Sequence, residues 1–67
     1  MPVPKIGDII EAYFFDDGIM RQIKLFDVRR IGPEWFELSG REVSNQKIFV
    51  VSLHQDTIRI VGDNYNE

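Results

Sequence analysis

The one histidine of the chain, His54, lies between Ser52 and Asp56, an alternation that could suggest a nucleophile, a base and an acid. In a strand, residues two apart share a face but lie about 7 Å from each other, too far for a hydrogen bond between nucleophile and base. In a helical turn the three side chains would point in different directions. We therefore interpret His54 as a loop histidine beside a capping aspartate, and we predict that the protein is not an enzyme.

Composition also argues against metal and cofactor sites. The absence of cysteine excludes disulfides, thiolate nucleophiles and Cys-based metal sites, and a single histidine cannot form an all-histidine site within one chain. The sequence contains no Gly-rich phosphate loop, no Gly-x-Ser-x-Gly and no His-Glu-x-x-His. The adjacent carboxylates Asp16 and Asp17 precede Gly18, so we interpret them as turn residues. We expect no catalytic residue, no cofactor and no metal.

Binding chemistry is better represented than catalysis. Strand alternation places several aromatic residues on the outer face or at a rim, with Phe49 as a further candidate, and basic residues lie nearby in the sequence: Arg21, Lys24, Arg29, Arg30 and Arg41. From these we predict the following partner-binding surface: Tyr13, Phe15, Arg29, Arg30 and Trp35. Aromatic and arginine side chains form hot spots in protein interfaces, and they also stack unpaired bases and hold phosphates.

The formal charge of −3 favours a protein partner, a second copy of the chain included. Single-stranded RNA or DNA stays open as the alternative partner. A third interpretation is that Tyr13 and Trp35 only complete a small core. We predict a non-enzymatic binding or regulatory module, of a size that would suit a bacterial or phage accessory protein.

The elements that must position these residues are predicted to be strands. The 67 residues allow one domain, and they include nine Ile, six Val and five Phe but only three Leu and one Ala. Side chains branched at Cβ pack well on a pleated sheet, whereas the residues that favour helices are nearly missing. The predicted class is therefore all-β.

Alternation and turn residues divide the chain. We expect strands over residues 8–15, 19–31, 35–39, 47–53 and 57–61, a hairpin loop over 40–46 and one helical turn over 52–56. The residues expected to face inward are Ile10, Ala12, Phe14, Phe36 and Leu38. Because Val28 has the opposite parity to Ile23 and Leu25, a bulge near Phe26 and Asp27 is expected. An extended arm (1–6) and a polar tail (62–67) complete a five-stranded SH3-like barrel.

Two segments carry a family resemblance. Asp16-Asp17-Gly18 followed by Ile23-Lys24-Leu25-Phe26-Asp27 resembles the first half of the Sm-like RNA-binding family, in which a turn precedes a bent strand that ends in Phe-Asp. Residues 43–49 (Val-Ser-Asn-Gln-Lys-Ile-Phe) are similar to a strand of its bacterial branch. The resemblance implies a small barrel and a ring-forming RNA binder. The Lys-His pair of the bacterial branch is absent, so only the fold is carried over.

The expected location is cytoplasmic. Residues 1–5 lack the apolar core of a signal peptide, and the longest uninterrupted apolar runs, 12–15 and 48–51, are far shorter than the roughly 18 residues of a membrane helix.

Overall fold

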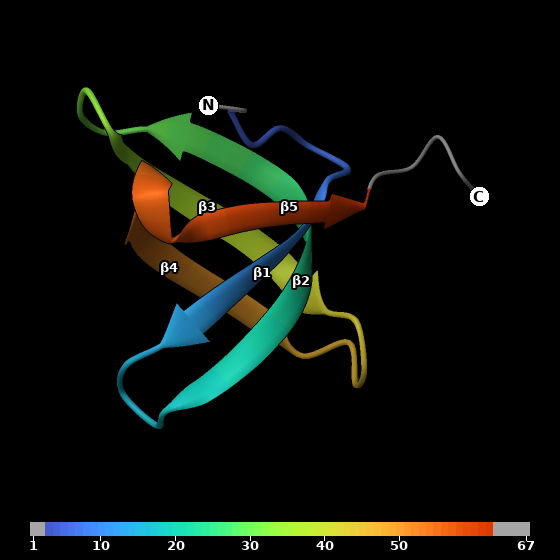
Figure 1. The fold of residues 1–67 in the computed structure, drawn as a ribbon. Helices are drawn as coiled ribbons and strands as arrows, with labels where there is room; N and C mark the ends of the chain where they lie inside the picture. Colours follow the sequence, from blue (N-terminus) through green and yellow to red (C-terminus); the bar gives the residue numbers. More distant parts are fainter. Residues whose placement is uncertain (1–2, 63–67) are drawn as a thin grey trace.

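The fold consists of β-strands and one short turn of 3-10 helix. The computed structural model describes residues 3–62. Its elements are β1 (Ile9–Phe14), β2 (Ile19–Arg30), β3 (Trp35–Glu42), β4 (Ile48–His54), the 3-10 turn η1 (Gln55–Thr57) and β5 (Ile58–Gly62) (Figure 1). The all-β class, the five strands and the helical turn before the last strand are therefore confirmed.

The strands form one antiparallel sheet in the order β4-β3-β2-β1-β5. Strands β1 to β4 follow one another as neighbours, and the chain then returns so that β5 pairs with the other edge of β1. Figure 1 shows the sheet curling, with β5 crossing the region of β1 and β2. Within residues 3–62 no strand pairing joins β4 to β5, so the sheet is not closed.

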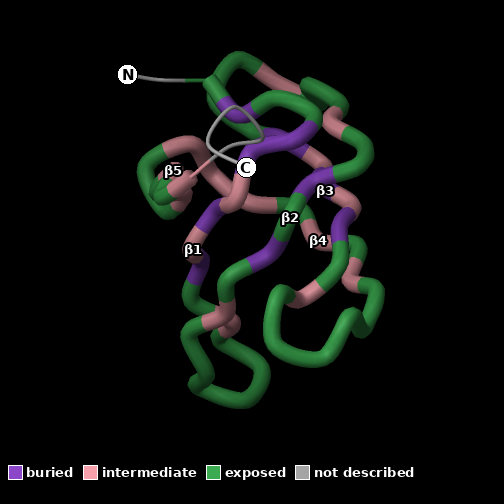
Figure 2. Tube along the Cα trace, turned by 90° about the vertical axis from the view of Figure 1, so that its right-hand side faces the viewer, coloured by how far each residue is buried: buried purple, intermediate pink, exposed green. Residues whose placement is uncertain are grey.

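The core is formed by alternate residues of the three central strands. The buried apolar residues of these strands are each at most 2 % exposed, and they are Ile10, Ala12, Ile23, Leu25, Phe36 and Leu38. Figure 2 shows these buried positions along the middle of β1, β2 and β3. Burial of each large side chain stabilises the fold by about 1.5–3 kcal/mol. The predicted inward residues of β1 and β3 are thus confirmed, and Phe14 is half-buried at the margin of the core.

The predicted bulge in β2 is confirmed. The pairing of β2 with β3 shifts between Leu25 and Asp27, which leaves Phe26 without a partner in β3. The shift lets Val28 pack against the core although its parity differs from that of Leu25. Phe26 itself points outward and is 48 % exposed.

The loop predicted over residues 40–46 begins too early. Strand β3 continues to Glu42, and the reversal is confined to the residues before β4. Gly40 is buried inside the strand because β2 approaches it closely: a Cβ there would lie 2.5 Å from Ile23 Cγ2 and 2.5 Å from the Lys24 carbonyl oxygen. The turn uses Gln46, whose φ is +64°, in place of a glycine.

The helical turn begins later than predicted. Residues 52–54 belong to β4, and η1 spans Gln55–Thr57. His54 is the N-cap residue, since its ring accepts a hydrogen bond from the Asp56 amide. The cap is therefore the histidine and not the neighbouring aspartate.

The N-terminal arm does not stay extended up to Ile6. It turns at Ile6 and Gly7, where the Gly7 amide donates to the Leu25 carbonyl (2.9 Å) and the Leu25 amide donates to the Asp8 carbonyl (2.9 Å). The buried Asp8 carboxylate accepts from the Lys5 amide at 3.0 Å. The arm is thus fastened to β2. Of the predicted tail, Gly62 belongs to β5, and residues 63–67 lie outside the described residues, as do residues 1–2 of the arm.

Candidate interaction surfaces

Tyr13 and Phe15 form an exposed aromatic pair at the end of β1. Their ring centroids lie 5.0 Å apart in an edge-to-face arrangement, and Phe15 is 77 % exposed. Beside them a groove of about 290 Å³ separates this end of β1 from residues 50–53 of β4; we call it the β1–β4 groove. Gly18, at φ +70°, closes the turn, and a Cβ there would lie 3.3 Å from the Tyr13 hydroxyl.

Trp35 lies elsewhere, on the outer face of β3, opposite His54 of β4 in the strand register. The two rings meet edge to face at 5.2 Å, and Trp35 is 47 % exposed. Both ring nitrogens of His54 are engaged: Nδ1 accepts from the Asp56 amide at 3.0 Å, and Nε2 lies 3.1 Å from Glu34 Oε1. Because Nδ1 accepts a hydrogen bond, Nε2 is the ring nitrogen that donates one to Glu34.

Arg29 and Arg30 point to opposite faces of β2, as adjacent strand residues must. Arg29 forms an ion pair with Glu37 at 3.4 Å on the outer face. Arg30 lies over the ring of buried Phe36, 5.2 Å from its centroid, and donates to the Pro33 carbonyl. The five predicted contact residues therefore do not form one surface. Phe49, the sixth candidate, is half-buried against the core and is not a rim residue.

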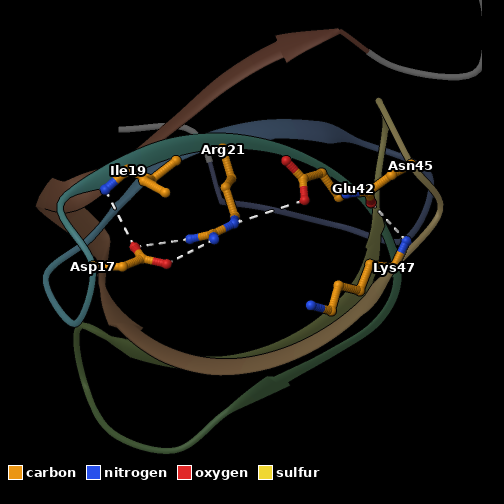
Figure 3. A network of polar contacts seen from close by, with 6 residues as sticks. All are labelled: Asp17, Ile19, Arg21, Glu42, Asn45 and Lys47. Carbon is orange, nitrogen blue, oxygen red and sulfur yellow. Dashed lines mark hydrogen bonds and ion pairs between the residues drawn. The ribbon is translucent and has the colours of Figure 1, made fainter.

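Sequence reasoning missed a polar cluster around Arg21 (Figure 3). Arg21 lies opposite buried Ala12 in the register, so its side chain turns inward and is only 12 % exposed. The guanidinium donates to both carboxylate oxygens of Asp17, at 2.7 and 3.1 Å, and lies 3.7 Å from Glu42. Its central carbon lies 4.7 and 4.8 Å from the ring centroids of Phe14 and Phe49.

The pairing of Arg21 with Asp17 changes the acidity of both groups. The hydrogen bonds from Arg21 lower the pKa of the Asp17 carboxyl, and the same bonds raise the pKa of the Arg21 guanidinium. Strands β1, β2, β3 and β4 each place a residue in or beside this cluster. The cluster therefore connects the β1–β2 turn to the end of the sheet at which β4 lies. The only sign of this pair in the sequence is that Asp17 and Arg21 are four residues apart, with Gly18 between them. That spacing indicates a contact only when the register of β1 and β2 is known.

A second groove, of about 470 Å³, is the larger of the two; we call it the arm groove. Its walls are Ile6 and Gly7 of the arm, Leu25 and Phe26 of β2, and Arg41 and Val43 of β3 and the hairpin. The lining is apolar apart from Lys24, Arg41 and Gln46. Sequence reasoning missed it because the wall formed by the arm exists only after the arm turns onto β2.

In residues 3–62 no three His, Asp or Glu side chains lie close enough together to hold a metal ion. No helix in the same range has the length and hydropathy of a transmembrane span. Comparisons with protein-family models, with curated proteins and with solved structures gave no match to this chain.

Proposed function

We propose that the protein is a non-enzymatic interaction module that binds an extended segment of another protein chain along the free edge of β4. The observation that carries this proposal is the position of β4 at the end of the sheet, paired only with β3. An unpaired strand edge offers a row of backbone donors and acceptors to an incoming strand.

The direction of these backbone groups follows from the hairpin. The Glu42 amide donates to the Lys47 carbonyl at 2.8 Å, which makes this pair a hydrogen-bonded one. In antiparallel strands, hydrogen-bonded and non-hydrogen-bonded residue pairs alternate. Counted along the register from the Glu42 and Lys47 pair, the N–H and C=O groups of Phe49 and Val51 therefore point toward β3. The N–H and C=O groups of Ile48, Val50 and Ser52 therefore face the open edge.

The side chains of β4 do not protect this edge. Residues 48–53 (Ile-Phe-Val-Val-Ser-Leu) contain no charge, no proline and no glycine, the devices that usually prevent strand addition. Val50 is 62 % exposed and Ile48 is 53 % exposed. The other end strand, β5, has five residues and carries the exposed Arg59. The β1–β4 groove adds room beside the edge for the side chains of a bound segment.

Two further assignments belong to this proposal. The lack of enzymatic activity is supported by His54, whose two ring nitrogens are both held by neighbours. An SH3-like or Sm-like barrel, open between β4 and β5, is supported by the long bulged β2 and by η1 before the last strand. The edge-to-face contact of Phe14 with Phe49, at 5.2 Å, brings β1 and β4 together across the curl.

The test uses peptides selected from a displayed random library on the wild-type protein. We expect their affinity to fall at least about tenfold in Val50→Lys, because a lysine at the edge opposes strand addition. Ile31→Lys is the matched control, since Ile31 is also exposed but lies outside β4 and lines neither groove. N-methylation of alternate peptide amides should weaken binding in the same way. Selected peptides that bind Val50→Lys as tightly as wild type would refute the proposal.

A second arm tests the nucleic-acid alternative. Mixed single-stranded oligonucleotides are titrated at low salt, where phosphate contacts are strongest. We expect no binding, because Arg29 is paired with Glu37 and Arg30 lies over Phe36. Binding that survives in Val50→Lys but is lost in the Arg29→Ala, Arg30→Ala double variant would favour a nucleic-acid partner instead.

A further inference from the structure

The arm groove is built by contacts on both of its sides. On one side the arm is held to β2 by the reciprocal hydrogen bonds of Gly7 and Asp8 with Leu25. On the other side the Val43 amide donates to the Gln22 carbonyl at 2.9 Å, which fastens the hairpin to β2. The floor between them includes buried Leu25 and half-buried Ile9. The groove is therefore present before any partner binds.

The groove combines an apolar floor with positive charge. Lys24 and Arg41 lie directly opposite each other in the register of β2 and β3, and both line the groove. The Arg41 guanidinium therefore attracts an anionic group to the margin of the apolar floor. The bulge turns Phe26 outward at the same place, with the Arg41 guanidinium 6.0 Å from its ring centroid. The matching ligand is an aromatic or branched side chain next to a carboxylate.

The β1–β2 turn of the chain itself carries this chemistry. Phe15 is the most exposed of the large apolar side chains in residues 3–62, at 77 %. Asp16 follows it, and within that range its carboxylate takes part in no hydrogen bond or ion pair, whereas Asp17 is held by Arg21. The turn lies at the lower left of Figure 1 and the arm at the upper right, so one copy cannot fill its own groove.

We propose that the β1–β2 turn of one copy binds in the arm groove of a second copy. Phe15 covers the apolar floor and the Asp16 carboxylate lies beside the Arg41 guanidinium. Because two different surfaces meet, the contact is heterologous: a pair of copies keeps a free groove on one copy and a free turn on the other. Repetition of the contact produces a ring or an open chain. This contact is separate from strand addition at β4, and neither requires the other.

Sedimentation velocity over a concentration series tests the proposal. We expect the wild-type sedimentation coefficient to rise with concentration, and the association constant to fall at least about tenfold in Phe15→Ser and in Arg41→Glu, as at an interface hot spot. Lys47→Glu is the matched control because it makes the same charge change at an exposed residue outside the groove. Circular dichroism checks that each variant is folded, and Arg41→Gln provides a milder change if Arg41→Glu unfolds the chain.

Mixing the two variants distinguishes this contact from a symmetric one. Phe15→Ser keeps an intact groove and Arg41→Glu keeps an intact turn, so an equimolar mixture should form 1:1 dimers that grow no further. A wild-type protein that stays monomeric up to millimolar concentration overturns the proposal. Self-association that survives both variants but is lost in Val50→Lys also overturns it, and would show that a second copy binds at the β4 edge instead.

Discussion

The Arg21 guanidinium holds the Asp17 carboxylate through two parallel hydrogen bonds, of 2.7 and 3.1 Å, although Gly18 and a chain reversal separate the two residues. Asp17 also accepts from the Ile19 amide at 3.2 Å, so one carboxylate fastens both the turn and the strand that follows it. Paired hydrogen bonds of this kind fix orientation as well as distance. The exposed tip of the turn, Phe15 and Asp16, is thereby presented from a rigid base.

Replacing Arg21 with methionine should lower the Tm by several degrees. The variant loses both bonds to Asp17 and the contact of the guanidinium with the rings of Phe14 and Phe49. Thermal unfolding followed by circular dichroism measures the change. Arg59→Met is the matched control: Arg59 pairs with Glu11 at 3.3 Å, but its side chain is 77 % exposed. Equal Tm losses in the two variants would contradict a special role for Arg21.

The same pair predicts a loss of stability in acid. Since Arg21 lowers the pKa of Asp17 in the folded state, the folded protein binds the proton less readily than the unfolded chain. The stabilisation is therefore complete above the unfolded-state pKa and is lost as the pH falls from about 4 through the lowered value. Asp17→Asn should be less stable than wild type at neutral pH, and the difference should shrink on acidification. A difference that is constant from neutral pH to pH about 2.5, measured by urea unfolding, would refute this linkage.

Local alternation predicted most of the sheet, because burial repeats every second residue along each strand. It gave the inward positions Ile10, Ala12, Phe36 and Leu38, and the parity of Val28 revealed the bulge. The candidate site was predicted less well, since it depends on distances across the fold. The inward direction of the Arg21 side chain, for example, follows only from the register of β1 and β2.

The misplaced hairpin loop has the same origin. A glycine between polar residues usually indicates a turn. Gly40 lies instead inside β3, because the neighbouring backbone leaves no space for a side chain. The sequence does not contain that distance, which arises when β2 packs against β3.

Gly40→Ala should therefore destabilise the protein by about 3 kcal/mol, the upper part of the usual range for overpacking. Its Cβ would lie 2.5 Å from a side-chain carbon of Ile23 and from the backbone oxygen of Lys24, and the backbone cannot move without disturbing the sheet. Gly32→Ala is the control, because its Cβ would meet Trp35 Cβ at an ordinary 3.6 Å, and its change should stay within about 1 kcal/mol. Urea unfolding measures both variants, and a Gly40→Ala protein as stable as wild type would show that the strands can separate there.

The buried carboxylate of Asp8 makes the final prediction, which concerns the arm. Asp8 is 2 % exposed and accepts from the Lys5 amide at 3.0 Å, while its own amide donates to the Lys5 carbonyl at 3.0 Å. Asp8→Ala leaves the Lys5 amide without its acceptor, and we expect a loss of about 1–2 kcal/mol. The Gly7 amide, which donates to Leu25, should then exchange its hydrogen faster than in wild type, because the arm opens more often. Asp27→Ala, a change at an exposed strand residue, is the control. Unchanged exchange at Gly7 in Asp8→Ala would mean that the backbone bonds to Leu25 alone hold the arm, and that the wall of the arm groove does not depend on this carboxylate.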